Sequence, residues 1–231
     1  MTAVAIHQPE YFPMLGYLDK ARRADVFVLL DDVQFDRSSL QHRARVAGAA
    51  GLTWMTIPFV HRFPQRLDEV EVADARFPVK HRKTLAACYG RAPGWAHASA
   101  RLEALFAAAP RRLVDATVPS VEVLFEAFGV RPRVVRSSAL GVEGDKAELV
   151  LAICRALGAT RYLSGRTGAG YLDAEAFRAA GIAVDVVAFA PPDYPRLRPL
   201  PADARGLSAL DAWFHLGADA PAVFNREPEA S

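Results

Sequence analysis

The side chains best suited to chemistry in this sequence gather close to its N-terminus, directly after the short apolar run 2–6. An imidazole, an amide, a phenol and an ammonium group follow one another there, at His7, Gln8, Tyr11 and Lys20. Imidazole can act as a general acid or base or hold a phosphate, and an ammonium group can hold an anion. We therefore take His7 as a catalytic candidate and Gln8, Tyr11 and Lys20 as substrate-binding candidates. The alternative for His7 is a structural role, which is the usual one for a single histidine.

Gly16 lies near the start of a predicted helix, 15–25. The free backbone N–H groups at a helix start, together with the helix dipole, favour an anion such as a phosphate or a carboxylate. Pro9 and Pro13 stiffen the loop that precedes this helix. The segment is therefore predicted to place a phosphate-binding Gly16 close to His7.

Two adjacent carboxylates, Asp31 and Asp32, end a second apolar run, 26–30. Adjacent side chains on an extended backbone point to opposite faces, so at most one of the two is expected in a site. We take Asp31 as a catalytic base or as the group that orients one. Arg43 and Arg45 fall on the same side if their segment is a strand, and Arg43 is predicted to clamp a phosphate or carboxylate. A solvated basic loop is the alternative.

A basic cluster containing His81 and Lys83 opens a helical region. Positive charge at a helix start opposes the helix dipole, which suggests an anionic partner for both residues. The alternative is an ordinary exposed helix.

Ser164 and Gly165 begin a glycine-rich loop that follows another apolar run and reaches Tyr171. Glycines permit close approach of the backbone to a ligand and can form an anion-binding nest. The loop lacks the Lys-Ser/Thr ending of a Walker A motif and the spacing of a dinucleotide fingerprint. It is therefore predicted to be a generic ligand cradle that includes Ser164, Gly165 and Tyr171.

The order strand, loop, helix and strand within residues 2–30 positions the first of these candidates. This order is a βαβ unit, and such units imply a parallel sheet with its site at the carboxyl ends of the strands. Because parallel strands bring their carboxyl ends to one edge, His7, Asp31 and Ser164 are predicted to line one pocket. Arg43 joins them if its segment folds back over that edge.

The remaining pattern completes an α/β protein. Short strands are predicted within 46–72, and Ala-, Leu- and Arg-rich periodicity predicts a helical insertion at about 79–128. Beyond it, strands and helices alternate: strands at 133–136, 161–165 and 182–189, and helices at 146–157, 174–180 and 208–216. The predicted fold is a mainly parallel, Rossmann-like sheet in a single domain, 1–217, with a flexible tail at 218–231.

Composition bounds the classes of partner. Hydrophobic residues make up 52% and charged residues 23%, which is typical of a globular protein. Lys+Arg number 28 against Asp+Glu 26, so no global field attracts nucleic acid, and nucleic acid is not expected as the main ligand. No apolar run reaches the roughly 20 residues that a membrane helix needs. We therefore expect no membrane insertion and a cytoplasmic location.

Two further classes of site find little support in the sequence. The six histidines show no metal-ligand spacing, so no metal site is predicted, and no G-x-S-x-G nucleophile elbow occurs. Cys88 and Cys154 lie far apart in apolar patterns and are expected to be reduced structural residues, with a reactive thiol as the alternative.

Several motifs together resemble the WbqC-like family. They are His7-Gln8-Pro9-x-Tyr11-x-Pro13-x-x-Gly16-Tyr17-x-x-Lys20, Asp31-Asp32-Val33-Gln34-Phe35, Gln41-x-Arg43-x-Arg45, Trp54-Met55-Thr56-Ile57-Pro58, His81-x-Lys83-x-Leu85, Tyr162-Leu163-Ser164-Gly165, Tyr171-Leu172-Asp173 and Ser208-x-Leu210-Asp211. The likeness extends as far as Gly217, and the opening motif is its most specific part. Met14, Leu40 and His42 depart from residues that the family often has.

The resemblance implies a role near bacterial surface-polysaccharide or specialised-metabolite synthesis, in which an acyl or aminoacyl group is attached to an amine of an amino sugar. In organisation, the opening segment also resembles the nucleotide-binding start of nucleotidyltransferases and class I synthetases, although Tyr17 stands at the place of their second histidine. These likenesses imply a transferase or ligase that uses a phosphate-bearing, nucleotide-linked or aminoacyl donor, with a nucleotide such as ATP as the candidate cofactor. The alternative is a non-catalytic protein that binds a nucleotide or nucleotide-sugar.

Overall fold

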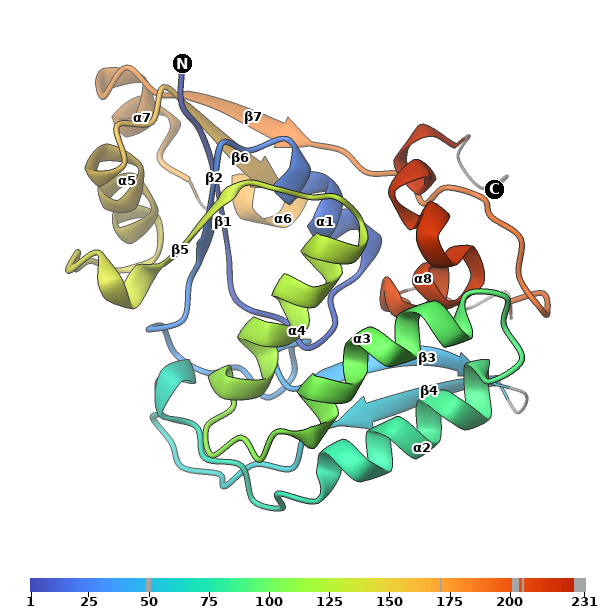
Figure 1. Ribbon diagram of the computed structural model, residues 1–231. Helices are drawn as coiled ribbons and strands as arrows, with labels where there is room; N and C mark the ends of the chain where they lie inside the picture. The colour runs from blue at the N-terminus through green and yellow to red at the C-terminus, as the bar shows by residue number, and fades with distance from the viewer. Residues whose placement is uncertain (49–50, 171, 201–203, 205, 227–231) are drawn as a thin grey trace.

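The computed structural model describes residues 1–231 except 49–50, 171, 201–203, 205 and 227–231. Its centre is a parallel sheet of five strands in the order β5-β2-β1-β6-β7 (Figure 1). The strands are β1 (Ala3–His7), β2 (Val26–Leu29), β5 (Arg133–Arg136), β6 (Arg161–Gly165) and β7 (Ala183–Val187). The expected mainly parallel α/β fold is confirmed, including the parallel pairing of the first two strands.

The strand order reverses direction at β1. From β1 the chain adds β2 and then β5 on one side, and it later returns to add β6 and β7 on the other. In such doubly wound sheets, ligands bind in the crevice at the carboxyl ends of the strands where the order reverses. In this protein the order reverses between β1 and β6, so the rule points to the ends of these two strands.

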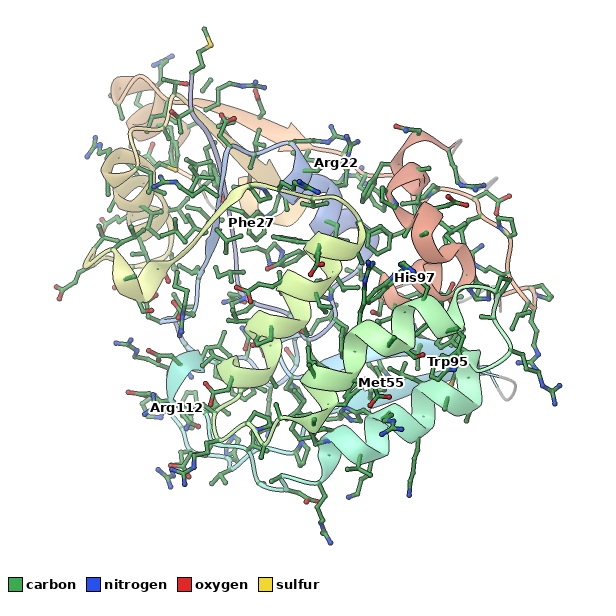
Figure 2. The ribbon with its side chains drawn as sticks, viewed as in Figure 1. Arg22, Phe27, Met55, Trp95, His97 and Arg112 are labelled. Carbon is green, nitrogen blue, oxygen red and sulfur yellow. The ribbon has the colours of Figure 1, made fainter. Side chains whose placement is uncertain are left out.

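Helices cover both faces of the sheet (Figure 1). One face packs against α1 (Leu15–Arg22) and α4 (Val114–Ala127), and the other against α5 (Lys146–Ala156) and α7 (Ala174–Ala179). Alternate strand residues divide between the two cores, as the period of two along a strand requires. In Figure 2, Phe27 of β2 belongs to the first core, where its ring meets Phe125 of α4 edge-on at 5.4 Å between ring centroids.

A second unit separates β2 from β5. It contains an antiparallel hairpin, β3 (Arg43–Gly48) and β4 (Gly51–Thr56), followed by α2 (Phe77–Tyr89) and α3 (Trp95–Ala107) and then α4. Met55 of β4 is buried in the same core as helices α2 and α3 (Figure 2). The helices therefore occupy the segment for which alanine-rich periodicity predicted them, and the hairpin replaces the several short strands expected at 46–72.

Helix α6 (Arg166–Ala169) follows β6, and helix α8 (Leu210–Leu216) packs near the C-terminus. Within the segment predicted to be a flexible tail, the described residues Gly217–Asn225 form a 3-10 helix, and residues 227–231 lie outside the described chain. Ala220 and Val223 are fully buried there, so small apolar side chains bring this segment onto the core.

Candidate functional site

His7 ends β1, where the strand order reverses. Its Nδ1 lies 3.1 Å from the Gln8 carbonyl oxygen, which can only accept, so Nδ1 carries the proton and donates. The neutral ring therefore has its lone pair on Nε2. Burial and the charge of Lys20 lower the pKa of His7 to about 3, so the ring is neutral at physiological pH. The ring also packs on Tyr17 of α1, with 4.6 Å between ring centroids.

Glu10 lies beside this histidine, with 3.9 Å between its Oε1 and His7 Nδ1. Burial raises the pKa of Glu10 to about 7, and the Lys20 charge offsets part of the increase. Its Oε2 is buried and accepts no hydrogen bond from the described residues. A carboxyl group in this state can both give and take a proton near neutral pH.

Lys20 of α1 is the third ionisable group, and only 6% of its surface is exposed. Its Nζ donates to the Ile6 carbonyl oxygen at 3.0 Å, and within the described chain no carboxylate lies close enough to form an ion pair with it. Burial lowers the pKa of Lys20 to about 8, while Glu10 raises it in part. An ammonium group has three donors, so Lys20 retains the capacity to bind an anion.

The loop that carries these groups is fastened to the helical unit. Tyr11 is buried, and its hydroxyl donates to Nδ1 of His81 at 2.9 Å, because His81 Nε2 donates to the Thr56 carbonyl oxygen. The next residue, Phe12, has a φ of 45°, a backbone conformation that is strained for a bulky side chain. Its N–H donates to Ser120 Oγ of α4. The surrounding structure thus holds the loop in one strained conformation, as occurs in preorganised sites.

Gln8 is held from a different direction. Gln41, which is 1% exposed, donates from its Nε2 to Gln8 Oε1 at 2.8 Å. The Oε1 of the same Gln41 accepts from the backbone N–H of Asp36 at 3.0 Å. The Tyr17 hydroxyl donates to the Gln8 carbonyl oxygen at 3.3 Å.

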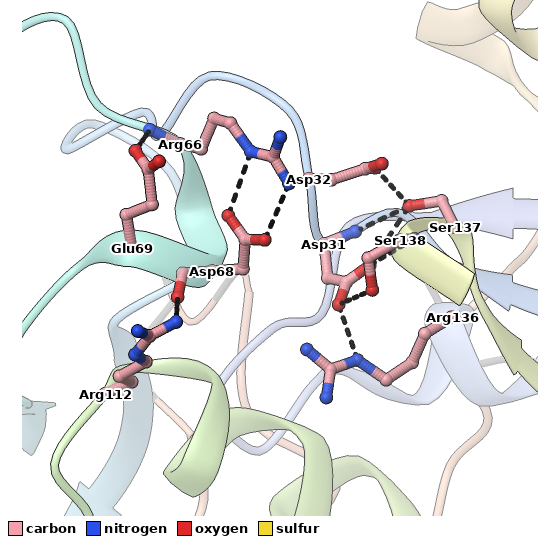
Figure 3. Close-up of polar contacts among 9 residues, drawn as sticks. All are labelled: Asp31, Asp32, Arg66, Asp68, Glu69, Arg112, Arg136, Ser137 and Ser138. Atoms are coloured by element: carbon pink, nitrogen blue, oxygen red, sulfur yellow. Dashed lines mark hydrogen bonds and ion pairs between the residues drawn. The ribbon is translucent and has the colours of Figure 1, made fainter. Parts of the chain in front are cut away.

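Asp31 lies in a different environment from the one expected of a catalytic base. It is fully buried and accepts from the Ser138 N–H, the two hydroxyls of Ser137 and Ser138, and Arg136 Nε (Figure 3). Although burial alone would raise its pKa, these hydrogen bonds and the Arg136 charge together lower it. A saturated carboxylate with a lowered pKa is a weak base. These contacts connect the end of β2 to the end of β5, which favours a structural role for Asp31 over the predicted catalytic one.

Of the three expected anion clamps, Arg43 and His81 are engaged with other protein groups, whereas Lys83 is exposed. Arg43 donates to the carbonyl oxygens of Ser38 and Ser39 and stacks on Trp54, 4.8 Å from the ring centre to the guanidinium carbon. Burial lowers the pKa of His81 to about 4. Lys83 is exposed on α2, on the surface of the helical unit. The sequence correctly placed Arg43 and Arg45 on one strand, but Arg43 is engaged with the loop that precedes it.

The end of β6 contributes backbone to this edge of the sheet. Ser164 is fully buried, and its hydroxyl donates to the Gly165 carbonyl oxygen. Its side chain is therefore turned inward, whereas Gly165 is partly exposed, and Gly168 and Gly170 further along the loop are exposed. Tyr171 lies outside the described residues. At Gly16, a Cβ atom would lie 3.0 Å from the Phe189 ring, so packing also accounts for that glycine.

The pocket predicted to be lined by His7, Asp31, Ser164 and Arg43 stays a prediction, although His7 and Ser164 do lie on adjacent parallel strands. His7, Gln8 and Lys20 surround the end of β1, and parallel pairing of β1 with β6 places Gly165 at the neighbouring strand end. Neither Glu10 nor Gln41 was predicted from the sequence as a site residue, although Gln41 belongs to the motif Gln41-x-Arg43-x-Arg45. The signal for Glu10 was its position three residues after His7, but its raised pKa arises from burial that only the fold creates.

A separate cavity of about 190 Å³ lies between the β3–β4 hairpin, α2 and α8. Its carboxylate, Asp211, accepts from the hydroxyls of Tyr89 and Tyr194 and from Arg196 Nε. None of the predicted site residues that the structure describes lines this cavity. The ionisable groups of the end of β1, Glu10 and Lys20, retain hydrogen-bonding capacity that the described residues do not use.

The described part of the chain offers neither a metal-binding cluster nor a membrane-spanning helix. It contains no group of three or more His, Cys, Asp or Glu residues arranged to hold a metal ion. Across the same residues, no helix has both the length and the apolar character needed to cross a membrane.

Comparison with known proteins places this arrangement in a family. The model of the WbqC-like protein family matches residues 8–223. "Uncharacterized protein Rv1507c" of Mycobacterium tuberculosis is 27% identical over 235 residues, which cover 96% of each chain. No solved structure matches the chain. The match includes both the β1–α1 loop and the C-terminal helices, so the chain belongs to the WbqC-like protein family.

Proposed function

We propose that this protein is a group-transfer enzyme, a transferase or ligase that attaches an acyl or aminoacyl group to an amine of an amino sugar or specialised metabolite. The activated substrate would carry a phosphate, and ATP or another nucleotide is the candidate source of it. The observation that carries the proposal is the cluster of His7, Glu10 and Lys20 at the end of β1, where the strand order reverses.

Each group suits one part of such a transfer. The amine nitrogen attacks the acyl carbon, the phosphate leaves with the bonding electron pair, and the amine loses one proton. Glu10, with a pKa of about 7, accepts that proton as a carboxylate. Lys20 is mainly protonated at neutral pH and stabilises charge on the departing phosphate. Neutral His7 presents Nε2 as an acceptor that orients the amine N–H.

The direct test is a thermal-shift screen with nucleotides, nucleotide-sugars, amino acids and aminoacyl donors, because ligand binding stabilises the folded state. We expect a shift for a phosphate-bearing ligand that Lys20→Met abolishes. The matched control is Lys83→Met, which removes an exposed lysine on α2 and is expected to leave the shift unchanged. An equal loss of the thermal shift in Lys20→Met and Lys83→Met would contradict a binding site at Lys20.

Turnover is then measured with the ligands that bind. Glu10→Gln and His7→Ala are each expected to keep binding but lower turnover roughly 10²-fold, since each removes a group that handles or orients the transferred proton. The rate of the unmodified protein should also rise as pH increases through about 7, and Glu10→Gln should remove this dependence. Binding without turnover for any pair of substrates would support the alternative of a nucleotide- or nucleotide-sugar-binding protein.

A further inference from the structure

The orientation of one side-chain amide at the proposed site follows from a backbone N–H that lies outside it. The N–H of Asp36 is a donor only, so the atom of Gln41 that it meets at 3.0 Å is the oxygen, Oε1. Gln41 must therefore present its NH₂ group to Gln8, and the atom of Gln8 at 2.8 Å must be the oxygen as well. Both amide orientations therefore follow from the chain of hydrogen bonds that begins at Asp36.

This leaves Gln8 with one kind of group to offer. Its Oε1 is occupied by Gln41, and its Nε2 has no acceptor among the described residues. Oxygen and nitrogen are separate atoms on the amide carbon, so the contact of Oε1 with Gln41 does not use the two donors of Nε2. Gln8 is partly exposed and directly follows His7 at the end of β1, so its NH₂ group is available to a ligand there.

We propose that Gln41 is a positioning residue that holds Gln8 as an obligatory donor, and that Gln8 selects substrates with a phosphate or carboxylate oxygen at this point. This inference rests on the proposed function and narrows its substrate class. A freely rotating glutamine would accept or donate with equal ease, and would discriminate less against ligands with a donor in that place. Lys20 supplies the positive charge and Gln8 supplies the directed donors, so the two together favour an anionic group rather than a neutral hydroxyl.

The probe is inorganic pyrophosphate, with ATP as the second probe, and binding is measured by calorimetry. Gln8→Ala is expected to weaken pyrophosphate binding about tenfold, because it removes a hydrogen bond to a charged group. Gln41→Met keeps the size of the side chain but releases Gln8, and is expected to weaken binding several-fold. In a Gln8→Ala background, Gln41→Met should cause no further loss of affinity.

Comparison of the two single variants with the double variant distinguishes a positioning role of Gln41 from a merely structural one. Loss of the Gln41 side chain leaves the Asp36 N–H without its partner and so lowers stability in both backgrounds. If Gln41→Met weakens pyrophosphate binding by the same factor with and without the Gln8→Ala substitution, Gln41 acts through general stability and the inference is wrong.

The orientation of the Gln8 and Gln41 side-chain amides can be measured without any ligand. Scalar coupling across the hydrogen bond from the Gln41 side-chain nitrogen to the Gln8 side-chain carbonyl carbon is expected in the unmodified protein, and is expected to be absent in Gln41→Met. Absence of that coupling from the unmodified protein overturns the positioning role. Failure of pyrophosphate and ATP to bind, with the coupling present, overturns both the selected substrate class and the phosphate-based function but leaves the amide orientation established.

Discussion

At the scale of single residues, two carboxylates close to neighbouring strand ends have opposite properties. Asp31 is surrounded by hydroxyl, amide and guanidinium donors, so its charged form is favoured and its pKa is lowered. Glu10 is buried with fewer donors, so its pKa rises to about 7. Asp31, which belongs to a pair of adjacent acids, is therefore the poorer base. Glu10, which was not predicted as a site residue, is the better one.

The raised pKa of Glu10 predicts a pH dependence of stability. An acid whose pKa rises from 4.5 to about 7 on folding is ionised first in the unfolded chain, so stability falls as pH rises between these values. Glu10→Gln removes this cost. We expect the variant to be more stable than the unmodified protein by about 2 kcal/mol at about pH 8.5, and equally stable at about pH 4.5. The expected gain in stability is smaller than the whole pKa shift of Glu10 would give, because Glu10→Gln also removes the negative charge that stabilises the Lys20 ammonium group.

Urea unfolding at the two pH values measures this difference. Lys83→Met serves as the control, because it removes a charged side chain that lies exposed on the surface of α2. A Glu10→Gln variant whose difference in stability is the same at both pH values would show that burial does not raise the Glu10 pKa.

At the scale of elements, the β1–α1 loop depends on contacts with the helical unit. Tyr11 reaches His81 of α2, Phe12 is held by Ser120 of α4, and the Tyr11 N–H donates to the Leu40 carbonyl oxygen. The sequence-based prediction assigned Tyr11 and His81 to substrate binding. Their burial instead indicates that they fix the loop that carries His7 and Glu10.

Tyr11→Phe tests this coupling. The change leaves Nδ1 of buried His81 without a donor and is expected to cost about 1–2 kcal/mol of unfolding free energy. It should also speed hydrogen exchange at the amides of residues 7–12. Tyr194→Phe is a matched control, because it removes another buried hydroxyl, at Asp211, and should lower stability without changing exchange in the loop. Unchanged hydrogen exchange of the loop amides in Tyr11→Phe would show that the loop does not depend on its contact with α2.

At the scale of the whole molecule, Asp211 joins parts of the chain that lie far apart in sequence. This fully buried residue of α8 accepts hydrogen bonds from Tyr89 of α2, from Tyr194 and from Arg196. The Tyr89 hydroxyl also accepts from the Ala47 N–H in the hairpin. One carboxylate thus connects the C-terminal helix to the helical unit and the hairpin.

Asp211→Ala is expected to destabilise the protein by about 3 kcal/mol or more, because it removes the acceptor from two buried hydroxyls and from Arg196, whose side chain is 10% exposed. Asp185→Ala is the control. Its partner Arg161 is half exposed, so the loss should stay below about 1 kcal/mol. Urea unfolding compares the two, and similar losses would show that the Asp211 cluster is not a structural centre.

Most helices and strands of the central α/β fold, and their order along the chain, could be predicted from the sequence. Apolar runs bounded by His7, Asp31 and Ser164 predicted parallel strands, and alanine-rich periodicity predicted the helices between β4 and β5, because these patterns reflect local geometry and burial on one face. The sequence also indicated that the end of β1 carries chemistry, since polar groups there follow a buried strand directly.

The availability of these groups for chemistry could not be predicted from the sequence, because it depends on long-range packing. A pKa depends on burial and on charges brought from elsewhere in the chain, so the opposite shifts of Glu10 and Asp31 have no local signal. The same holds for the orientation of Gln8, which depends on a hydrogen bond from a residue that lies 33 positions away. Residue type and spacing identify candidates, but long-range packing determines which of them are saturated by other protein groups and which are left to meet a ligand.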